Sequence, residues 1–386
     1  MFELDDRLRT ARQHARDWTG ELRAAALELD ADPDAIHRHL DLPPVRHLAS
    51  MLIPPAYNPN PVVVDGHRFY GMSALERAVF AEEIASGDAG MLLAAPGASL
   101  SGVLVDLLAD DEQKAWFYGR LLAAPTWTFF ALTEPDRGSD AAAMQTALAP
   151  APDGDGLVLR GAKRYIGNAA RAQVGVVFAR DRPGPLGAAA VFVETDAAGF
   201  KAEPIPTVGL RGAQICAVTL DGVPVPANRV LGRHLSPTRR GVWSGVQMFN
   251  RLRPGVAAIA LGVARAAHEY VAANRRELRT WERLRWERTG RRIDGVRQLI
   301  HQAAATVDAQ PTNGYVASAA KARAARLAEE VTLEALEFFG AGARLAHPML
   351  DKLVRDARGV EFMEGTGNIQ RLNVFQGLVQ GKLNRG

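Results

Sequence analysis

The stretch LVLRGAKRYIG, residues 157–167, decides how the chain is organised. It begins a series of short β-rich runs that Gly, Pro and Asp separate, which is the pattern of strands joined by turns. The later runs are QVGVVFAR (173–180), AAAVFVETD (188–196) and CAVTLDGVPVP (216–226). Together they predict a small sheet domain over residues 125–236.

Helical patterns lie on both sides of this sheet domain. Upstream, apolar residues recur at spacings of three and four, and Ser73 with Glu76 forms a capping box before a helix. Downstream, long amphipathic patterns cover residues 255–279, 299–309 and 318–339 and indicate a bundle of long helices. We therefore predict an α+β chain with a helical domain over 1–124, the β-domain over 125–236 and a second helical domain over 237–386.

Composition excludes several classes of protein. The 386 residues are 47% hydrophobic and 23% charged, as in ordinary globular proteins, and the net charge of +3 gives no support to nucleic-acid binding. One cysteine cannot form a disulfide or a Cys-rich metal site, and the histidines show no metal-ligand spacing, so we predict no metal. The charged N-terminus and the short apolar stretches predict a cytoplasmic protein with no membrane partner.

The first segment with candidate chemistry is ALTEPDRGSD, residues 131–140. It places Thr133, Gly138 and Ser139 in one loop, where hydroxyls and free N–H groups can converge on a phosphate or a flavin edge. A polar turn with helix-capping residues is the alternative interpretation. No Gly-x-Gly-x-x-Gly follows a strand, so a dinucleotide would bind without a Rossmann fingerprint.

The second segment is LVRDARGVEFMEGTGNIQR, residues 353–371. Its Glu364 follows Phe362 and Met363, and a carboxylate against apolar neighbours is poorly solvated. Poor solvation raises the pKa and makes the carboxylate a stronger base toward a weakly acidic C–H. The alternative is a helix-capping glutamate, or one that is ion-paired with Arg355 or Arg358.

Together, and in this order around a β insert, the two segments resemble the acyl-CoA dehydrogenase family. Further motifs in register are SGDAG (86–90), GAKRYIGNAARA (161–172), GLRGAQ (209–214), VPVPANRVLG (223–232), RLRPGVAA (251–258) and RDAR (355–358). The resemblance implies an N-terminal helical domain, a middle β-domain and a C-terminal four-helix bundle. It also implies FAD, held between the last two domains and across a subunit interface.

The resemblance also assigns residues to roles. Glu364 matches the usual catalytic base, and in the family its backbone N–H also helps to hold the substrate oxygen. Arg253 and Gly365 match positions beside the substrate, although Arg253 is equally well explained as a charge at a helix start before Pro254. The expected cofactor contacts are Leu132, Thr133, Gly138, Ser139, Tyr165, Gly167, Arg279, Trp281, Glu337, Gly340, Thr366 and Asn368.

Some positions depart from the family pattern. Gly167 stands where a Thr or Ser usually donates to the flavin, a change that points toward reactivity with oxygen. Tyr165 replaces a usual Trp. The contacts to a partner subunit's FAD are matched only loosely, by Arg279 and Trp281, and we predict an Arg-rich loop over 282–292 after them. Leu252 occupies the position of an alternative base, which leaves Glu364 without a rival.

A further resemblance is carried by GPLGAAAVFVETDAAGF (184–200), SPTRRGVW (236–243) and FNRLRPGVAAIALG (249–262). These segments resemble a branch of the family from bacterial secondary metabolism. Members of that branch oxidise acyl groups on an acyl carrier protein, including three-carbon units that become hydroxymalonyl or aminomalonyl extenders for polyketide biosynthesis. We expect an FAD-dependent dehydrogenase of a small acyl-ACP or acyl-CoA thioester, in a homodimer or homotetramer. Arg239, Arg240 and the 283–292 cluster would suit an acidic carrier.

Two questions stay open at this point, the electron acceptor and the function itself. The electron acceptor is an electron-transfer flavoprotein or oxygen. A flavin-dependent oxidase or monooxygenase of the same fold is the second function, and a catalytically idle protein that binds an acyl carrier is the third.

Overall fold

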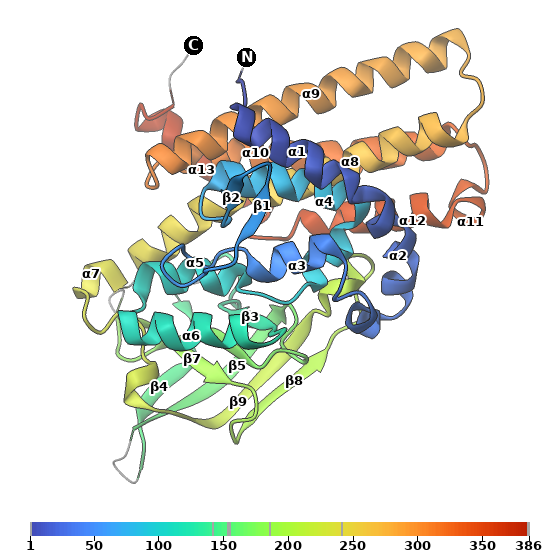
Figure 1. Cartoon of the computed structure of the whole chain (residues 1–386). Coiled ribbons are helices and arrows are strands. Elements are labelled where there is room, and N and C mark those ends of the chain that lie inside the picture. Colours follow the sequence, from blue (N-terminus) through green and yellow to red (C-terminus); the bar gives the residue numbers. More distant parts are fainter. Residues whose placement is uncertain (1, 141–142, 153–155, 185–186, 241, 384–386) are drawn as a thin grey trace.

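The computed structural model describes residues 2–140, 143–152, 156–184, 187–240 and 242–383. Helices form its first part (Figure 1). They are α1 (Asp6–Asp17), α2 (Thr19–Ala31), η1 (Pro33–Arg38), α3 (Pro43–Ser50), α4 (Ala74–Ala94), α5 (Ser99–Leu108) and α6 (Asp111–Ala123), with a hairpin of β1 (Val62–Val64) and β2 (His67–Phe69) between α3 and α4.

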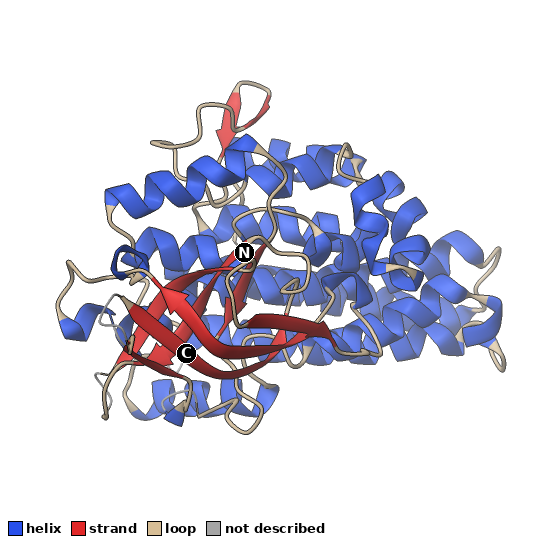
Figure 2. Cartoon of the chain, turned by 90° about the horizontal axis from the view of Figure 1, so that it is seen from below, coloured by secondary structure: helices blue, strands red, loops and turns tan. Residues whose placement is uncertain are grey.

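The middle part is one sheet with the strand order β3-β6-β4-β5-β9-β8 and with β7 on β6. Figure 2 shows these strands gathered in one twisted sheet, with the small β1–β2 hairpin apart from it. Their bounds are β3 (Thr128–Ala131), β4 (Ala147–Pro150), β5 (Leu157–Ile166), β6 (Val174–Arg180), β7 (Ala188–Glu194), β8 (Phe200–Pro204) and β9 (Cys216–Val225). Two short helical turns, η3 (Arg211–Ala213) and η4 (Ala227–Arg229), flank β9.

Helices return in the last part, where α8 (Val242–Asn274) packs against α4 and α10. The other helices are α7 (Pro237–Arg240), α9 (Thr280–Ala309), α10 (Tyr315–Glu337), α11 (Ala343–Ala346), α12 (Pro348–Val360) and α13 (Gly367–Val379). Small residues let α8 approach α4 closely, because a Cβ on Gly262 would lie 2.6 Å from the carbonyl oxygen of Glu82. The observed order of a helical, a β and a helical part is the predicted α+β fold.

One helix of the described chain is long and apolar enough to cross a membrane. It is Ser244–Asn274, within α8, and 72% of its apolar window is buried inside the protein. Burial of this kind is what a core helix shows.

Two local predictions differ from the structure. The Arg-rich loop over 282–292 is wrong, because these residues belong to the continuous helix α9. The buried positions in the first half of α9 include Glu282 and Thr289, so no apolar stripe marks this half as helical in the sequence. The capping box is only half formed: Ser73 accepts from the N–H of Glu76, but the Glu76 carboxylate accepts from the N–H of Gly71 at 2.5 Å.

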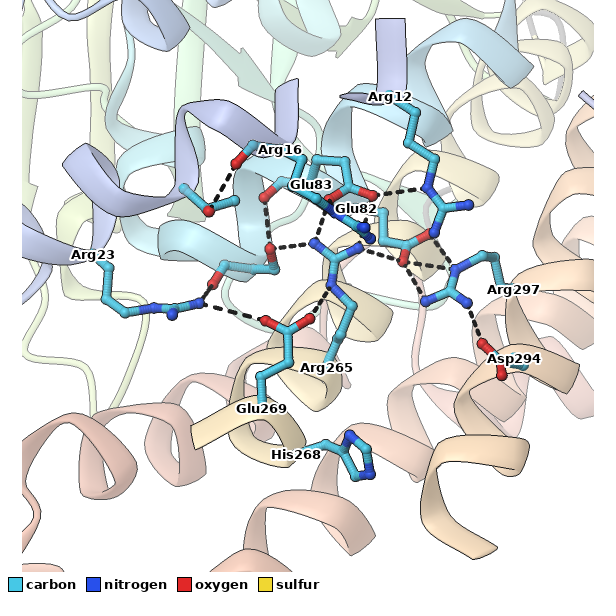
Figure 3. Close-up of polar contacts among 12 residues, drawn as sticks. Arg12, Arg16, Arg23, Glu82, Glu83, Arg265, His268, Glu269, Asp294 and Arg297 are labelled. Carbon is cyan, nitrogen blue, oxygen red and sulfur yellow. Dashed lines mark hydrogen bonds and ion pairs between the residues drawn. The ribbon is translucent and has the colours of Figure 1, made fainter. Parts of the chain in front are cut away.

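The helical parts are joined by a buried ion network (Figure 3). Arg265 of α8 donates to Glu82 at 3.0 Å and to Glu83 at 2.7 Å, both on α4. Arg297 of α9 also donates to Glu82, and Arg12 of α1 donates to Glu83. Because buried charges are costly unless they are paired, this network favours one arrangement of the four helices.

Candidate active site

Glu364 lies in the short loop between α12 and α13, in an unusual backbone conformation. Its φ is +52° and that of the following Gly365 is +98°. Left-handed backbone is costly for a residue with a Cβ, and it persists only where the surroundings impose it. The surroundings are buried hydrogen-bond donors: the side-chain amide of Gln370 donates to the carbonyl oxygens of Glu364 (3.0 Å) and Gly365 (3.2 Å).

The carboxylate of Glu364 is withdrawn from water. Its Oε2 is buried and has no hydrogen-bond partner among the described residues, although other atoms of the residue are partly exposed. Burial raises the pKa of Glu364 to about 7, against the opposing charges of Arg253, Lys321 and Arg77. The interpretation as a partner of Arg355 or Arg358 is wrong, because Arg355 pairs with Asp30 and Asp351, and Arg358 with Glu329.

Each of the three cations near Glu364 bonds elsewhere; Arg77 and Lys321 are buried and Arg253 is half-buried. Arg253 donates to Asn250 at 3.0 Å, and its Nε is buried without a partner among the described residues. Arg77 donates to backbone carbonyls, including that of Arg251 on α8 at 2.7 Å. Lys321 donates to the carbonyl oxygens of Glu361 and Gly365. The charges therefore act on Glu364 through space and leave its Oε2 free.

Lys321 and Arg77 are absent from the sequence-based set, although the sequence carries a signal for both. Lys321 stands on the alanine-rich stripe that includes Ala317 and Ala324, and all three are fully buried. Arg77 lies in the same way on the buried face of α4. A charge on a buried stripe is costly and therefore marks a position with a special role.

The loop that carries Leu132 and Thr133 is fixed from β5. Lys163 is fully buried and donates to the carbonyl oxygen of Leu132 and to Glu134, both at 3.0 Å. Although burial raises the pKa of Glu134, hydrogen bonds from Thr146, from the Gln145 and Thr146 backbone and from Lys163 bring it to about 2. The side chain and the backbone N–H of Thr133 have no partner within the described ranges.

Tyr165 and Gly167 lie at the end of β5. Tyr165 forms a bulge against β9, with φ of +64° and 61% of its surface exposed, so its ring is available to a ligand. A Cβ on Gly167 would lie 3.7 Å from the carbonyl oxygen of Ala213, an ordinary contact. A Cβ therefore fits at this position, and packing against it does not require glycine.

Contacts between the domains bring the Thr133 loop and the end of β5 toward the Glu364 loop. Leu132 packs in the same apolar cluster as Leu252, which precedes Arg253 on α8. Near the end of β5, the N–H of Asn168 donates to the Ala213 carbonyl at 2.9 Å. The same 208–214 loop is held by α12, because the N–H of Leu210 donates to Asp356 at 2.6 Å.

The remaining predicted cofactor contacts fall into two groups. Thr366 is the N-cap residue of α13, but its side chain makes no capping bond, and Asn368 is exposed in the first turn. Gly138 and Ser139 are exposed in the loop after Thr133. These four lie on the segments that carry Glu364 and Thr133.

Four contacts lie at the other end of the helical bundle. Arg279 and Trp281 lie where α9 begins, and Glu337 and Gly340 lie where α10 ends, away from α13 (Figure 1). All four are exposed. A groove of about 530 Å³ lies beside them, lined by Leu284, Arg285, Arg288, Thr289, Arg292 and Glu334. Within one chain these residues do not join Glu364.

Within the described ranges, no group of three or more His, Cys, Asp or Glu side chains is placed to hold a metal ion. The candidate site consists of the unpaired carboxylate of Glu364 and of three cations that bond elsewhere. The unpaired Thr133 and the exposed Tyr165 at the end of β5 complete it. Such a site offers an unpaired carboxylate that can act as a base.

Comparison with known proteins gives consistent matches. Residues 129–223 match the model for the acyl-CoA dehydrogenase middle domain, and residues 239–379 match the model for the acyl-CoA dehydrogenase C-terminal domain. A probable acyl-CoA dehydrogenase of Mycobacterium tuberculosis is 26% identical over 323 residues, which cover 80% of this chain and 82% of that protein.

Solved structures show the same fold. Butyryl-CoA dehydrogenase from Megasphaera elsdenii has a TM-score of 0.84 at 24% identity and covers 98% of this chain and 100% of its own. The prolyl acyl carrier protein oxidase AnaB has a TM-score of 0.81 at 21% identity, covering 97% of this chain and 100% of its own.

Proposed function

The chain belongs to the acyl-CoA dehydrogenase family, whose cofactor is FAD, and from this premise we propose that it oxidises a small acyl thioester with Glu364 as the base. The observation that supports this proposal best is the buried, unpaired Oε2 of Glu364. A carboxylate without hydrogen bonds is a stronger base than a solvated one, and the α-proton of a thioester is only weakly acidic.

The residues fit the cofactor. Thr133 and Thr366 have side chains without partners among the described residues. Tyr165 presents an exposed ring next to Arg164, whose N–H donates to the carbonyl oxygen of Thr133 at 2.9 Å. Unpaired hydroxyl and N–H groups suit the polar edge of an isoalloxazine, and an aromatic ring suits its face. When bound, FAD supplies the acceptor for the hydride that leaves the carbon next to the deprotonated one.

The protein's own groups perform the proton step. Glu364 takes the α-proton, and the electrons of that C–H bond form the new carbon–carbon double bond as the hydride departs. The backbone N–H of Glu364 has no acceptor in the described chain, so it is free to donate to the thioester oxygen, where negative charge develops. The cations Arg253, Lys321 and Arg77 favour the charged form of the base before reaction.

The reaction is expected to depend on pH through Glu364. Only the ionised base accepts a proton, and the pKa of Glu364 is about 7, so the rate constant of anaerobic flavin bleaching at low substrate should rise from pH 6 to pH 8 and then level off. Below pH 6 it should fall about tenfold per pH unit. Stopped-flow absorbance measures this profile, and a rate independent of pH between 5 and 9 would argue against Glu364.

The acyl group is small in this proposal, such as a three-carbon extender precursor, and its carrier is an acyl carrier protein or CoA. The fold shared with AnaB supports the first carrier, and exposed arginines such as Arg239, Arg283 and Arg288 suit an acidic partner. Several copies of the chain in one homo-oligomer would bring Arg279 and Trp281 to a neighbour's cofactor.

The test is anaerobic mixing of the purified flavoprotein with matched CoA and carrier-protein thioesters of the same three-carbon acyl group. Bleaching by at least one of them is expected, and the faster thioester identifies the carrier. A protein that takes up no FAD, or a flavin that no acyl thioester bleaches, contradicts the proposal and favours an idle carrier-binding protein.

A flavin-dependent oxidase is the second candidate, because Gly167 provides no hydroxyl although a Cβ would fit at this position. Mixing the reduced enzyme with oxygen separates the two functions. Slow reoxidation favours the dehydrogenase, with an electron-transfer flavoprotein as acceptor, and fast reoxidation favours the oxidase.

A further inference from the structure

Lys321 of α10 is a fully buried ammonium that bonds only to backbone. Its Nζ donates to the carbonyl oxygen of Glu361 at 2.6 Å and to that of Gly365 at 2.8 Å. No carboxylate pairs with it among the described residues. A buried charge without an ionic partner costs folding free energy, and a neutral side chain would fill the same space at lower cost. The position therefore calls for a reason other than stability.

The two carbonyls bracket the base, since one lies three residues before Glu364 and the other lies one residue after it. Gln370 donates to the carbonyls of Glu364 and Gly365 from α13, so donors from two helices hold three carbonyls of this loop. Glu361 closes the loop from its other end, because its carboxylate accepts the N–H of Gly367 at 2.6 Å.

The bonds act on a backbone that would not adopt this shape alone. Glu364 has φ of +52°, and such a conformation persists where the surroundings determine it. With the carbonyls of Glu364 and Gly365 turned toward Lys321 and Gln370, the N–H groups of Glu364 and Gly365 are left without acceptors in the described chain.

We propose that Lys321 is a positioning residue for the proposed oxidation: with Gln370 it clamps the carbonyls around Glu364 and so fixes the direction of the base. The inference rests on the proposed function. Lys321 touches neither the carboxylate of Glu364 nor, in this proposal, the substrate, and it acts through the backbone that carries the base.

The charge of Lys321 has a second effect that a purely structural residue would not have. Burial raises the pKa of Glu364, and the charges of Arg253, Lys321 and Arg77 lower it. The groups that act on Lys321 are Glu361, Glu364 and Arg253, and burial lowers the pKa of Lys321 to about 8. Loss of the ammonium should therefore raise the pKa of Glu364 further.

The experiment compares Lys321→Met and Gln370→Met with the wild-type enzyme and with Lys201→Met, which removes an exposed lysine from β8. Anaerobic flavin bleaching by the active thioester is followed from pH 5 to 9, and rates are expressed per bound flavin. For Lys321→Met we expect the plateau rate to fall at least tenfold and the pH midpoint to rise above 7. For Gln370→Met we expect a tenfold loss with no shift, because a neutral donor is removed. Lys201→Met should match the wild type.

A Lys321→Met enzyme with a plateau rate within twofold of wild type overturns the proposal. The proposal is also overturned if the loss of rate disappears once rates are expressed per bound flavin and the pH midpoint is unchanged. That result would show a structural role only. If Lys321→Met does not fold, Gln370→Met decides, and a wild-type rate there overturns the clamp. Bleaching that survives in Glu364→Gln would instead refute Glu364 as the base. This variant therefore distinguishes failure of the proposed function from failure of the proposed role of Lys321.

Discussion

Replacing Glu364 with glutamine is expected to abolish bleaching of the flavin by substrate while the protein stays yellow. The amide has nearly the same shape as the carboxylate, and Oε2 makes no hydrogen bond that the change would break. An amide cannot take up the α-proton, so the rate constant should fall by at least about 10³-fold, within the range that a positioned base supplies. Flavin absorbance and stopped-flow bleaching measure the two properties separately.

Glu329→Gln is the matched control for this change. Glu329 forms an ion pair with the exposed Arg358 on the adjoining helix, and exposed pairs contribute little to stability. Its bleaching rate should therefore stay within about twofold of wild type. If Glu364→Gln retains more than a tenth of the wild-type rate, another group removes the proton and the assignment of the base is wrong.

The largest effect on stability is expected for Lys352→Met. Lys352 bonds to the carboxylates of Asp88 and Asp356, and all three side chains are almost fully buried. Without the ammonium two buried carboxylates face each other, so the free energy of unfolding should fall by about 3–5 kcal/mol. Asp88 also caps the second half of α4, where the helix is interrupted at φ of −158°, so that helix should loosen as well.

The loss from Lys352→Met should depend on pH. Burial raises the pKa of Asp88 even in the presence of Lys352. A group whose pKa is higher in the folded than in the unfolded protein stabilises the fold at low pH and loses this effect as pH rises. The deficit should therefore be smaller at pH 5 than at pH 8.

Urea unfolding followed by circular dichroism measures this deficit. Lys201→Met, at an exposed pair with Glu203, is the control and should change the free energy of unfolding by less than about 0.5 kcal/mol. Adding Asp88→Asn to Lys352→Met should recover part of the loss, since it removes one of the two facing charges. An equal deficit at both pH values, with no recovery in the double variant, would show that packing and not charge explains the effect.

The sequence predicts the fold well where a pattern is strong, and less well where inward residues are polar. The four β-rich runs contain β5, β6, β7 and β9. β4 and β8 are short and mostly exposed, so they show no alternation of polar and apolar residues. The Arg-rich half of α9 is missed for a similar reason, because its inward positions include Glu282 and Thr289.

The candidate site was likewise predictable only in part. Glu364 was identifiable from its apolar neighbours and its motif, and the structure adds that its Oε2 is buried and unpaired. The residues that support it were not identifiable by type, since Lys321, Lys163 and Arg77 bond to backbone carbonyls from distant segments. Contacts of that kind depend on how helices and strands meet, which a local pattern does not encode.

The left-handed backbone at position 364 favours a glycine, whereas the proposed reaction requires a carboxylate there. A glycine there would relieve strain worth roughly 1–2 kcal/mol. It would also remove a carboxyl group whose raised pKa makes the fold less stable as pH rises through about 7. Selection for folding alone would thus replace this glutamate. Among descendants that no longer carry out the reaction, position 364 should therefore be one of the first to change.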